Sequence, residues 1–241
     1  MEPRTSVIEK RLKSIKRIIT VASGKGGVGK SLVASGLALH LATKSHKVGL
    51  LDLDVYGPSS HIILGVTTEY PVEEKGLIPP NVQGISFMSI VFFTQDKPSP
   101  FRGNDISNII LELLAITQWG PLDYLIIDMP PGLGEETLDV MKYMKHSEFL
   151  VVTTSSKVAM GSVSKLLKIL IELKKPILGV VENMTMKNTS YIEHEVQKLK
   201  VPYLGKIPFD NTLEDAIGHP DLLLKTPAMK HLVSVLKKIN L

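Results

Sequence analysis

The stretch from Ser23 to Ser31 reads SGKGGVGKS and could bind phosphate. It contains the pattern Gly-x-x-x-x-Gly-Lys-Ser, whose glycines let successive backbone N–H groups converge on phosphate oxygens. In such a loop Lys30 contacts the β- and γ-phosphates, and the Ser31 hydroxyl binds Mg²⁺. An apolar run precedes the loop and a helical pattern follows it, which favours a phosphate loop over a glycine-rich turn without a ligand. The loop also carries a second lysine, Lys25, for which one phosphate loop has no need.

Carboxylates end two of the apolar runs. Asp52 and Asp54 end the run LLDLD, and their spacing of two predicts side chains on the same side of a strand. Asp128 ends the run DYLIID, in the form of an aspartate that orients magnesium through its bound water. Because the carboxyl ends of parallel strands share one edge of a sheet, we expect these aspartates beside the phosphate loop. A structural alternative stays open: Asp52 or Asp54 could cap a helix beginning near Pro58, and Asp128 could simply end a strand.

A loop that senses the γ-phosphate is predicted directly after Asp128. Its residues are Pro130, Pro131 and Gly132.

The elements around these residues alternate between strands and helices. Apolar runs predict strands over 17–22, 47–54, 84–90, 123–130, 149–154, 176–183 and 201–208. Helical length and spacing predict helices over 30–43, 104–117, 135–144, 161–174 and 191–200. Strands that are apolar on nearly every residue indicate a parallel sheet buried on both faces. The predicted fold is a doubly wound, mostly parallel α/β sheet with helices on both faces.

We expect one domain over residues 1–241, with a basic N-terminal extension over 1–16 and a C-terminal amphipathic helix over 226–241. The stretch 67–83 combines three prolines, one glycine and mixed charges, which predicts a long surface excursion.

Composition excludes several classes of protein. Cysteine is absent, which excludes disulfides, thiolate zinc sites, a cysteine nucleophile and an iron–sulfur cluster held by the chain's own thiolates. No apolar run reaches the roughly 18 to 20 residues that cross a bilayer, and the charged N-terminus lacks the apolar segment of a secretory signal. A cytoplasmic protein is therefore expected. The net charge of +4 is mostly scattered, so nucleic-acid binding is not indicated.

Several motifs in order give the chain a specific resemblance. SGKGGVGKS, LLDLDVYGPS, FRG, WGPLDYLIIDMPPG, ENM and GKIPFD resemble the Mrp branch of the MinD/Mrp superfamily of deviant Walker A ATPases, which are described as iron–sulfur cluster carriers. The resemblance implies ATP and Mg²⁺ as ligands, a P-loop fold, and slow hydrolysis without a partner. In the family two subunits sandwich two nucleotides in a homodimer. By this resemblance Lys30 serves the nucleotide of its own subunit and Lys25 that of the partner.

The resemblance also assigns roles to single residues. Asp54 matches the residue that positions the attacking water, and Asp52 matches a magnesium-shell or loop-orienting carboxylate. Asn183 matches an asparagine that reads the adenine edge, although a polar residue that merely ends a strand is the alternative. Pro208 and Asp210 lie in the loop that flanks the base. The implied phosphate-loop contacts are Gly24, Lys25, Gly26, Gly27, Val28, Gly29, Lys30, Ser31 and Leu32.

The chain departs from the family pattern in four places. Leu32 and Leu133 replace threonines, and Asn104 replaces a proline. The fourth departure is that the cluster-binding Cys-x-x-Cys, expected shortly after ENM, is absent. His194 cannot replace a pair of cysteines, so we expect no cluster on this chain alone.

Two functions remain after these departures. The first is an ATPase of iron–sulfur cluster or metalloprotein assembly that works with a cysteine-bearing partner. The second is a MinD- or ParA-like switch that docks on a membrane or on DNA. Leu232, Val235, Leu236 and Ile239 share one face of the C-terminal helix beside lysines, which suits either a membrane-interface helix or a core helix. The motifs favour the first function, with membrane or nucleic acid as the less favoured partners.

Overall fold

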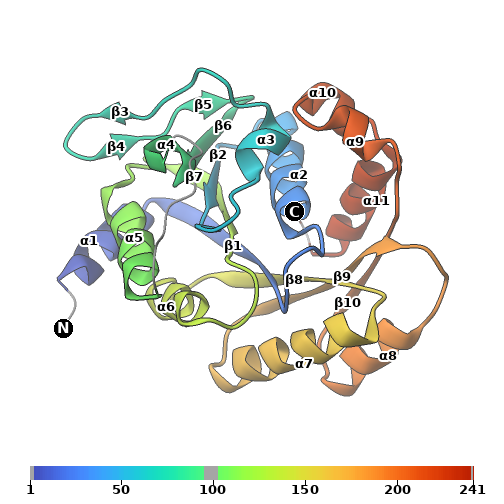
Figure 1. Ribbon diagram of the computed structural model, residues 1–241. Helices are drawn as coiled ribbons and strands as arrows, with labels where there is room; N and C mark the ends of the chain where they lie inside the picture. The colour runs from blue at the N-terminus through green and yellow to red at the C-terminus, as the bar shows by residue number, and fades with distance from the viewer. Residues whose placement is uncertain (1–2, 95–102, 240) are drawn as a thin grey trace.

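A computed structural model describes residues 3–94, 103–239 and 241. Within them, eight strands form one sheet in the order β10-β9-β8-β1-β7-β2-β6-β5 (Figure 1). Every neighbouring pair is parallel except β5 and β6. The predicted doubly wound fold is therefore confirmed. The strands are β1 (Ile15–Ser23), β2 (Val48–Asp52), β5 (Asn81–Val82), β6 (Ile85–Ser89), β7 (Leu122–Asp128), β8 (Glu148–Thr154), β9 (Ile177–Thr185) and β10 (Tyr203–Pro208).

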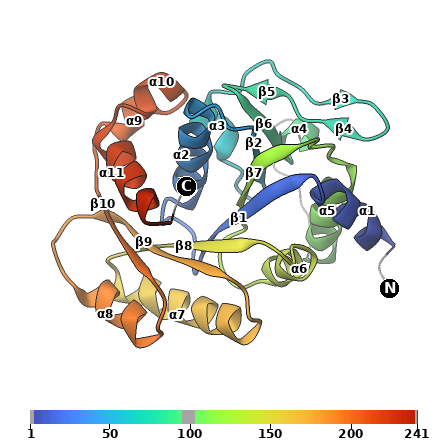
Figure 2. The same cartoon turned by 180° about the vertical axis from the view of Figure 1, so that it is seen from behind.

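Helices cover both faces of the sheet, as the two opposite views show (Figures 1 and 2). Each face has its own apolar core, because successive strand residues point to opposite sides: Ile18 of β1 belongs to one core and Ile19 to the other. One face carries α2 (Lys30–Thr43), α3 (Ser60–Leu64), α9 (Leu213–Ala216), α10 (Pro220–Leu223) and α11 (Pro227–Leu236). The other carries α1 (Arg4–Leu12), α5 (Gly103–Ile116), α6 (Glu135–Tyr143), α7 (Lys157–Glu172) and α8 (Tyr191–Lys198).

The N-terminal segment is not an extension, and that prediction is wrong for α1. Ile8 is 1% exposed in the core between α1, α5 and α6. Arg4 reaches α5, where its guanidinium donates to the Asn108 side-chain oxygen at 2.9 Å. α1 therefore belongs to the folded domain.

The C-terminal helix packs into the core on the opposite face. Leu232, Val235 and Leu236 of α11 are buried against α2 and β10, and the chain continues into a 3₁₀ turn over Lys237–Ile239. The apolar face of α11 is thus already covered by the domain, which favours a core helix over a membrane-interface helix. Within the described residues, no helix combines the length and hydropathy that crossing a membrane requires.

The predicted excursion over 67–83 holds short strands. β3 (Val72–Glu73) and β4 (Leu77–Ile78) form a separate antiparallel hairpin, and β5 returns to the edge of the main sheet. Val72 is 61% exposed, so the hairpin lies at the surface as expected. A further short helix, α4 (Val91–Thr94), follows β6. Phe101 and Arg102 of the FRG motif lie outside the described residues.

Candidate nucleotide-binding site

The phosphate loop joins β1 to α2, in the order that the sequence predicts. Gly27 and Gly29 have φ angles of 74° and 78°, in the left-handed region that glycine adopts without strain. The loop lines a cavity of about 310 Å³ together with Asp54 and Pro131. Loop residues 25–32, including Ser31 and Leu32, face this cavity. The loop and the cavity have the form of a phosphate-binding site at a helix N-terminus.

Two glycines let the loop approach its supports. A Cβ on Gly24 would lie 2.6 Å from the backbone of Ser162 and Val163 in α7, so only glycine fits there. A Cβ on Gly29 would lie 2.3 Å from the side-chain nitrogen of Asn183. The loop is therefore seated on α7 at its start and on β9 near its end.

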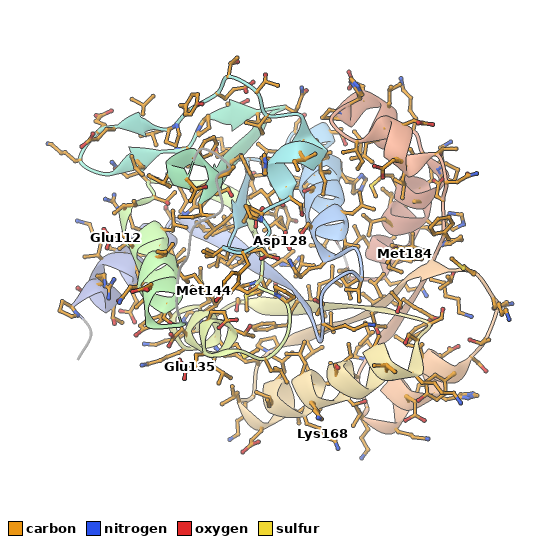
Figure 3. The ribbon with its side chains drawn as sticks, in the orientation of Figure 1. Glu112, Asp128, Glu135, Met144, Lys168 and Met184 are labelled. Atoms are coloured by element: carbon orange, nitrogen blue, oxygen red, sulfur yellow. The ribbon has the colours of Figure 1, made fainter. Side chains whose placement is uncertain are left out.

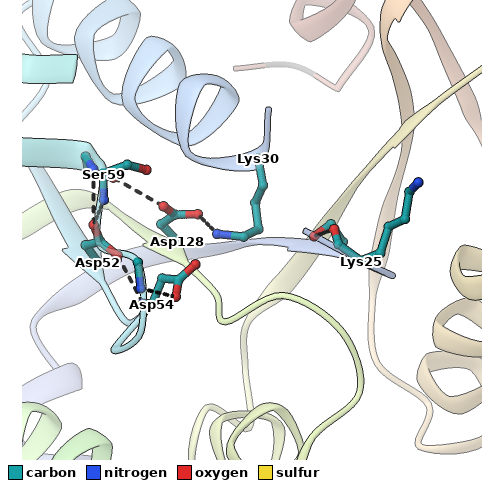
Figure 4. A network of polar contacts seen from close by, with 9 residues as sticks. Lys25, Lys30, Asp52, Asp54, Ser59 and Asp128 are labelled. Carbon is teal, nitrogen blue, oxygen red and sulfur yellow. Dashed lines mark hydrogen bonds and ion pairs between the residues drawn. The ribbon is translucent and has the colours of Figure 1, made fainter. Parts of the chain in front are cut away.

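Lys30 and Asp128 meet inside the site. The Lys30 ammonium contacts one carboxylate oxygen of Asp128, and the two side chains are 6% and 0% exposed (Figure 4). The other oxygen of Asp128 accepts a hydrogen bond from the Ser60 hydroxyl at 3.2 Å. Asp128 thus connects the phosphate loop to the start of α3.

Asp52 organises the turn after β2. Its carboxylate accepts the backbone N–H groups of Asp54 at 3.0 Å, Ser59 at 3.2 Å and Ser60 at 3.1 Å. These contacts match the capping alternative, because they satisfy donors at the start of α3. Complete burial raises the pKa of Asp52 to about 7; the negative charge of Asp128 adds to this rise, and the positive charge of Lys30 opposes it.

Asp54 lies beyond the end of its strand, so the strand-alternation argument is wrong for it. β2 ends at Asp52, so Asp54 is not part of the strand. The two aspartates are connected by a hydrogen bond from the Asp54 N–H to the Asp52 carboxylate. The Asp54 carboxylate accepts the Gly57 N–H at 3.1 Å and lines the cavity. Burial raises the pKa of Asp54, and the charge of Lys30 opposes this rise.

Lys25 points away from the aspartates. Figure 4 shows its side chain extending from the loop in a direction different from that of Lys30. Within the described part of the chain, its ammonium makes no hydrogen bond or ion pair, whereas the Lys25 carbonyl accepts the Ser23 hydroxyl at 2.9 Å. The two lysines of the loop are thus separated: Lys30 is buried beside Asp128, and Lys25 is half-buried where it lines the cavity.

The predicted γ-phosphate loop lies against the phosphate loop. Pro130 is buried and Pro131 lines the cavity. Gly132, with φ 89°, donates its N–H to the Ser23 carbonyl at 3.0 Å. Leu133, one of the departures from the family pattern, packs against one core, and Leu32 packs against the other. Packing therefore accounts for both leucines.

The residues expected around the adenine have other contacts in this structure. Asn183 is 2% exposed, and its amide donates to the Val28 carbonyl at 3.0 Å, beneath the loop. Pro208 and Asp210 do not line the cavity. The Asp210 carboxylate accepts the Thr212 hydroxyl at 2.6 Å and the Ala228 N–H at 2.9 Å, so it joins the loop after β10 to the start of α11. The Thr212 bond is the largest cause that lowers the pKa of Asp210.

Sequence reasoning assigned no role to two serines, Ser59 at the end of the motif LLDLDVYGPS and Ser60 directly after it. Ser59 lines the cavity, and Ser60, the first residue of α3, donates its hydroxyl to Asp128. His194 is exposed on α8, and no group of three His, Cys, Asp or Glu among the described residues is arranged to hold a metal.

Comparison with known proteins agrees with this geometry. A family model described as "ParA: NUBPL iron-transfer P-loop NTPase" matches residues 14–240. A Rickettsia felis protein named "Iron-sulfur cluster carrier protein" is 37% identical over 90% of this chain and 69% of its own length. A Pyrococcus horikoshii protein of the same name is 35% identical over 99% of this chain and 90% of its own length.

Solved structures show the same arrangement of elements. A nucleotide-binding protein from Archaeoglobus fulgidus in complex with ADP is 32% identical, with a TM-score of 0.79 over 94% of this chain and 95% of its own. The cell division ATPase MinD of Pyrococcus furiosus shares the fold at 22% identity and a TM-score of 0.69, over 93% and 98% of the two chains. The phosphate loop, the sheet order and the match over nearly the whole chain lead to one conclusion: the chain belongs to the family of NUBPL-type iron-transfer P-loop NTPases.

Proposed function

We propose that the chain binds ATP and Mg²⁺ at residues 24–32 and hydrolyses ATP as a nucleotide-dependent homodimer. The observation that carries this proposal is the different placement of the two lysines: Lys30 is buried beside Asp128, whereas Lys25 lines the cavity and extends away from the aspartates. In a homodimer that sandwiches two nucleotides, Lys30 contacts the phosphates of the nucleotide in its own subunit, and Lys25 contacts those of the nucleotide in the partner. Hydrolysis then depends on assembly, because each site needs a cation from the partner.

The donors around the cavity suit a magnesium nucleotide. Ser31 lines the cavity and Asp128 contacts Lys30 beside it, and both offer the hard oxygen atoms that Mg²⁺ prefers, while Asp52 holds the turn after β2. Bound Mg²⁺ supplies charge neutralisation to the phosphate oxygens. The chain's own contribution is to place backbone N–H groups of the loop around the phosphates and to move Lys30 from Asp128 to the nucleotide.

Asp54 is the residue that we assign to the attacking water. It reaches the cavity beside the loop, and its carboxylate accepts hydrogen bonds in a half-buried position. A carboxylate there can orient a water and accept its proton as the bond to phosphorus forms. Asn183 and the loop containing Pro208 and Asp210 remain our candidates for contacts to the base.

The biological role that we propose is iron–sulfur cluster or metalloprotein assembly. Relatives that are 35% and 37% identical are named iron–sulfur cluster carriers. This chain has no cysteine, so the cluster thiolates must come from a partner protein. A membrane-docking switch is the weaker alternative, because the apolar face of α11 is already buried.

Calorimetric titration with ATP and Mg²⁺ tests the nucleotide site. Lys30→Ala should lose most of its ATP affinity, whereas Lys168→Ala, which removes an exposed lysine from α7 (Figure 3), should bind as the wild type does. Equal affinities in the two variants would refute the site.

A further inference from the structure

Glu182 is a buried carboxylate that the proposed reaction does not use. It lies near the end of β9, beside Thr153 of β8 and Lys206 of β10, and its side chain is 0% exposed. One carboxylate oxygen accepts the Ser155 hydroxyl at 2.6 Å, and the other accepts the Tyr203 hydroxyl at 2.6 Å. Both lengths are typical of hydroxyl donors to a charged carboxylate. Glu182 therefore joins β10, through Tyr203, to the segment that follows β8.

Tyr203 is fixed as a donor in this arrangement. Burial, followed by its hydrogen bond to Glu182, raises the pKa of Tyr203 well above its ordinary value. Its hydroxyl keeps its proton at neutral pH, so one oxygen of Glu182 is always satisfied from the β10 side.

The other oxygen of Glu182 is connected to the phosphate loop through α7. Ser155 immediately precedes Ser156, the N-cap of α7, whose hydroxyl accepts the Ala159 N–H. One turn further along α7, the backbone of Ser162 and Val163 lies directly against Gly24. A shift in the start of α7 would therefore displace the phosphate loop, because Gly24 packs directly against the α7 backbone.

The residue after Glu182 supports the loop from its other end. Asn183 donates to the Val28 carbonyl at 3.0 Å, and Met184, labelled in Figure 3, follows at the end of β9. Two consecutive residues of one strand thus lie on the two supports of the phosphate loop: Asn183 contacts the loop directly, and Glu182 contacts Ser155, which precedes α7.

We propose that Glu182 is a positioning residue for the phosphate loop, which acts by fixing Ser155 and with it the start of α7. The inference rests on the proposed nucleotide site. It assigns unequal roles to the two hydroxyls: Ser155 leads to the loop, whereas Tyr203 ties Glu182 to β10. A merely structural carboxylate would make the two hydroxyls equivalent for nucleotide binding.

The test compares ADP binding by calorimetry, in the presence of Mg²⁺, across the full-length variants. Ser155→Ala should weaken ADP binding about tenfold and raise the KM for ATP with little change in kcat. The reason is that part of the binding free energy is then used to order the phosphate loop. Ser155→Thr keeps the hydroxyl and should restore affinity to within about twofold of the wild type. Tyr203→Phe should lower thermal stability and leave ADP affinity within about twofold.

Ser190→Ala is the matched control, since Ser190 is an exposed serine that precedes α8 and makes no cap bond. Wild-type affinity in Ser155→Ala, or an equal loss in Tyr203→Phe, would overturn the inference. ADP binding by the wild type tests the proposed nucleotide site. The role of Glu182 is tested separately, by the ratios of the ADP affinities of the variants to that of the wild type.

Discussion

Lys30 and Asp128 neutralise each other at the centre of the site, although each is suited to a different part of a magnesium nucleotide. The ammonium suits the phosphates and the carboxylate suits the metal shell. Ser60 holds the other carboxylate oxygen, so the pair is also connected to α3. In the proposed nucleotide complex the two charges separate, and each needs a new partner because both side chains are buried.

The first prediction concerns the stability of the nucleotide-free chain. Asp128→Asn leaves the buried Lys30 ammonium without a compensating charge, and the free energy of unfolding should fall by about 3 kcal/mol. Urea denaturation measures this change. Asp123→Asn is the control, because Asp123 pairs with the exposed Lys16 at 2.8 Å and its loss should matter far less. Similar losses in both variants would contradict the importance of the buried pair.

The second prediction contrasts two glycines. Gly24→Ala places a methyl group 2.6 Å from the backbone of α7, so the loop must shift and both stability and nucleotide affinity should decrease. Gly161→Ala, inside α7, meets no atom within 4 Å and should raise stability by about 0.5 to 1 kcal/mol through helix propensity. Thermal melts and ADP titrations measure both effects. A Gly24→Ala variant with wild-type affinity would show that the loop is not seated on α7.

The third prediction is a pH dependence that belongs to Asp52. Its pKa is about 7 in the folded chain against 3.8 as the reference value, so the folded state binds a proton that the unfolded state has released. The free energy of unfolding should therefore fall as pH rises from about 4 to about 7, by up to about 4 kcal/mol from this group.

Asp52→Asn removes the titrating group, so this part of the decrease should disappear. The measurement is urea denaturation of both proteins between pH 4 and pH 8 without nucleotide. Parallel stability curves for the variant and the wild type would show that the backbone N–H donors keep Asp52 ionised despite its burial.

Local patterns were sufficient to predict the main elements of the fold. The predicted helix over 30–43 coincides with α2, because the loop glycine before it and the polar segment after it mark its ends. The predicted strands were all found, since both faces of the sheet are buried and the strands are apolar throughout. α7 begins four residues earlier than predicted because Ser156 caps it, a signal that the apolar spacing did not reveal.

Contacts between distant segments could not be predicted in the same way. The sequence of α1 is typical of a charged extension. Its place in the domain depends on Ile8, which packs into a core that α5 and α6 complete. Within the site, the sequence placed Asp52, Asp54 and Asp128 at one edge. It could not show that Asp52 faces backbone donors, that Asp128 holds Lys30, or that Asn183 lies beneath the loop. These pairings link residues up to 155 positions apart, and only the folded topology brings them together.

The fourth prediction concerns the missing thiolates. Anaerobic reconstitution of the purified chain with iron and sulfide should give no visible charge-transfer absorbance, because iron–sulfur clusters are held by cysteine thiolates and this chain has none. Addition of a cysteine-bearing partner is the informative second arm. A stable brown protein with stoichiometric sulfide from this chain alone would contradict the prediction.

The last prediction separates the two lysines of the loop by complementation. Lys25→Ala should still bind ATP, because Lys30 and the loop backbone remain, but it should lose hydrolysis and ATP-dependent dimerisation together. Asp54→Ala should bind ATP and dimerise yet fail to hydrolyse, because only the group assigned to the attacking water is gone. Calorimetry measures ATP binding, size-exclusion chromatography with light scattering measures dimerisation, and a phosphate-release assay measures hydrolysis.

Mixing the two inactive variants tests whether Lys25 acts across the dimer. In a mixed dimer, the nucleotide held by the Lys25→Ala subunit has its own Asp54 and receives Lys25 from the partner, so that site is complete. The second site lacks both groups. If the sites act independently, each mixed dimer should recover up to about half of the wild-type rate, whereas a lysine that acts only within its own subunit gives no recovery. Full activity of Lys25→Ala alone, or no recovery in mixed dimers isolated with two different tags, would refute the role of Lys25 across the interface.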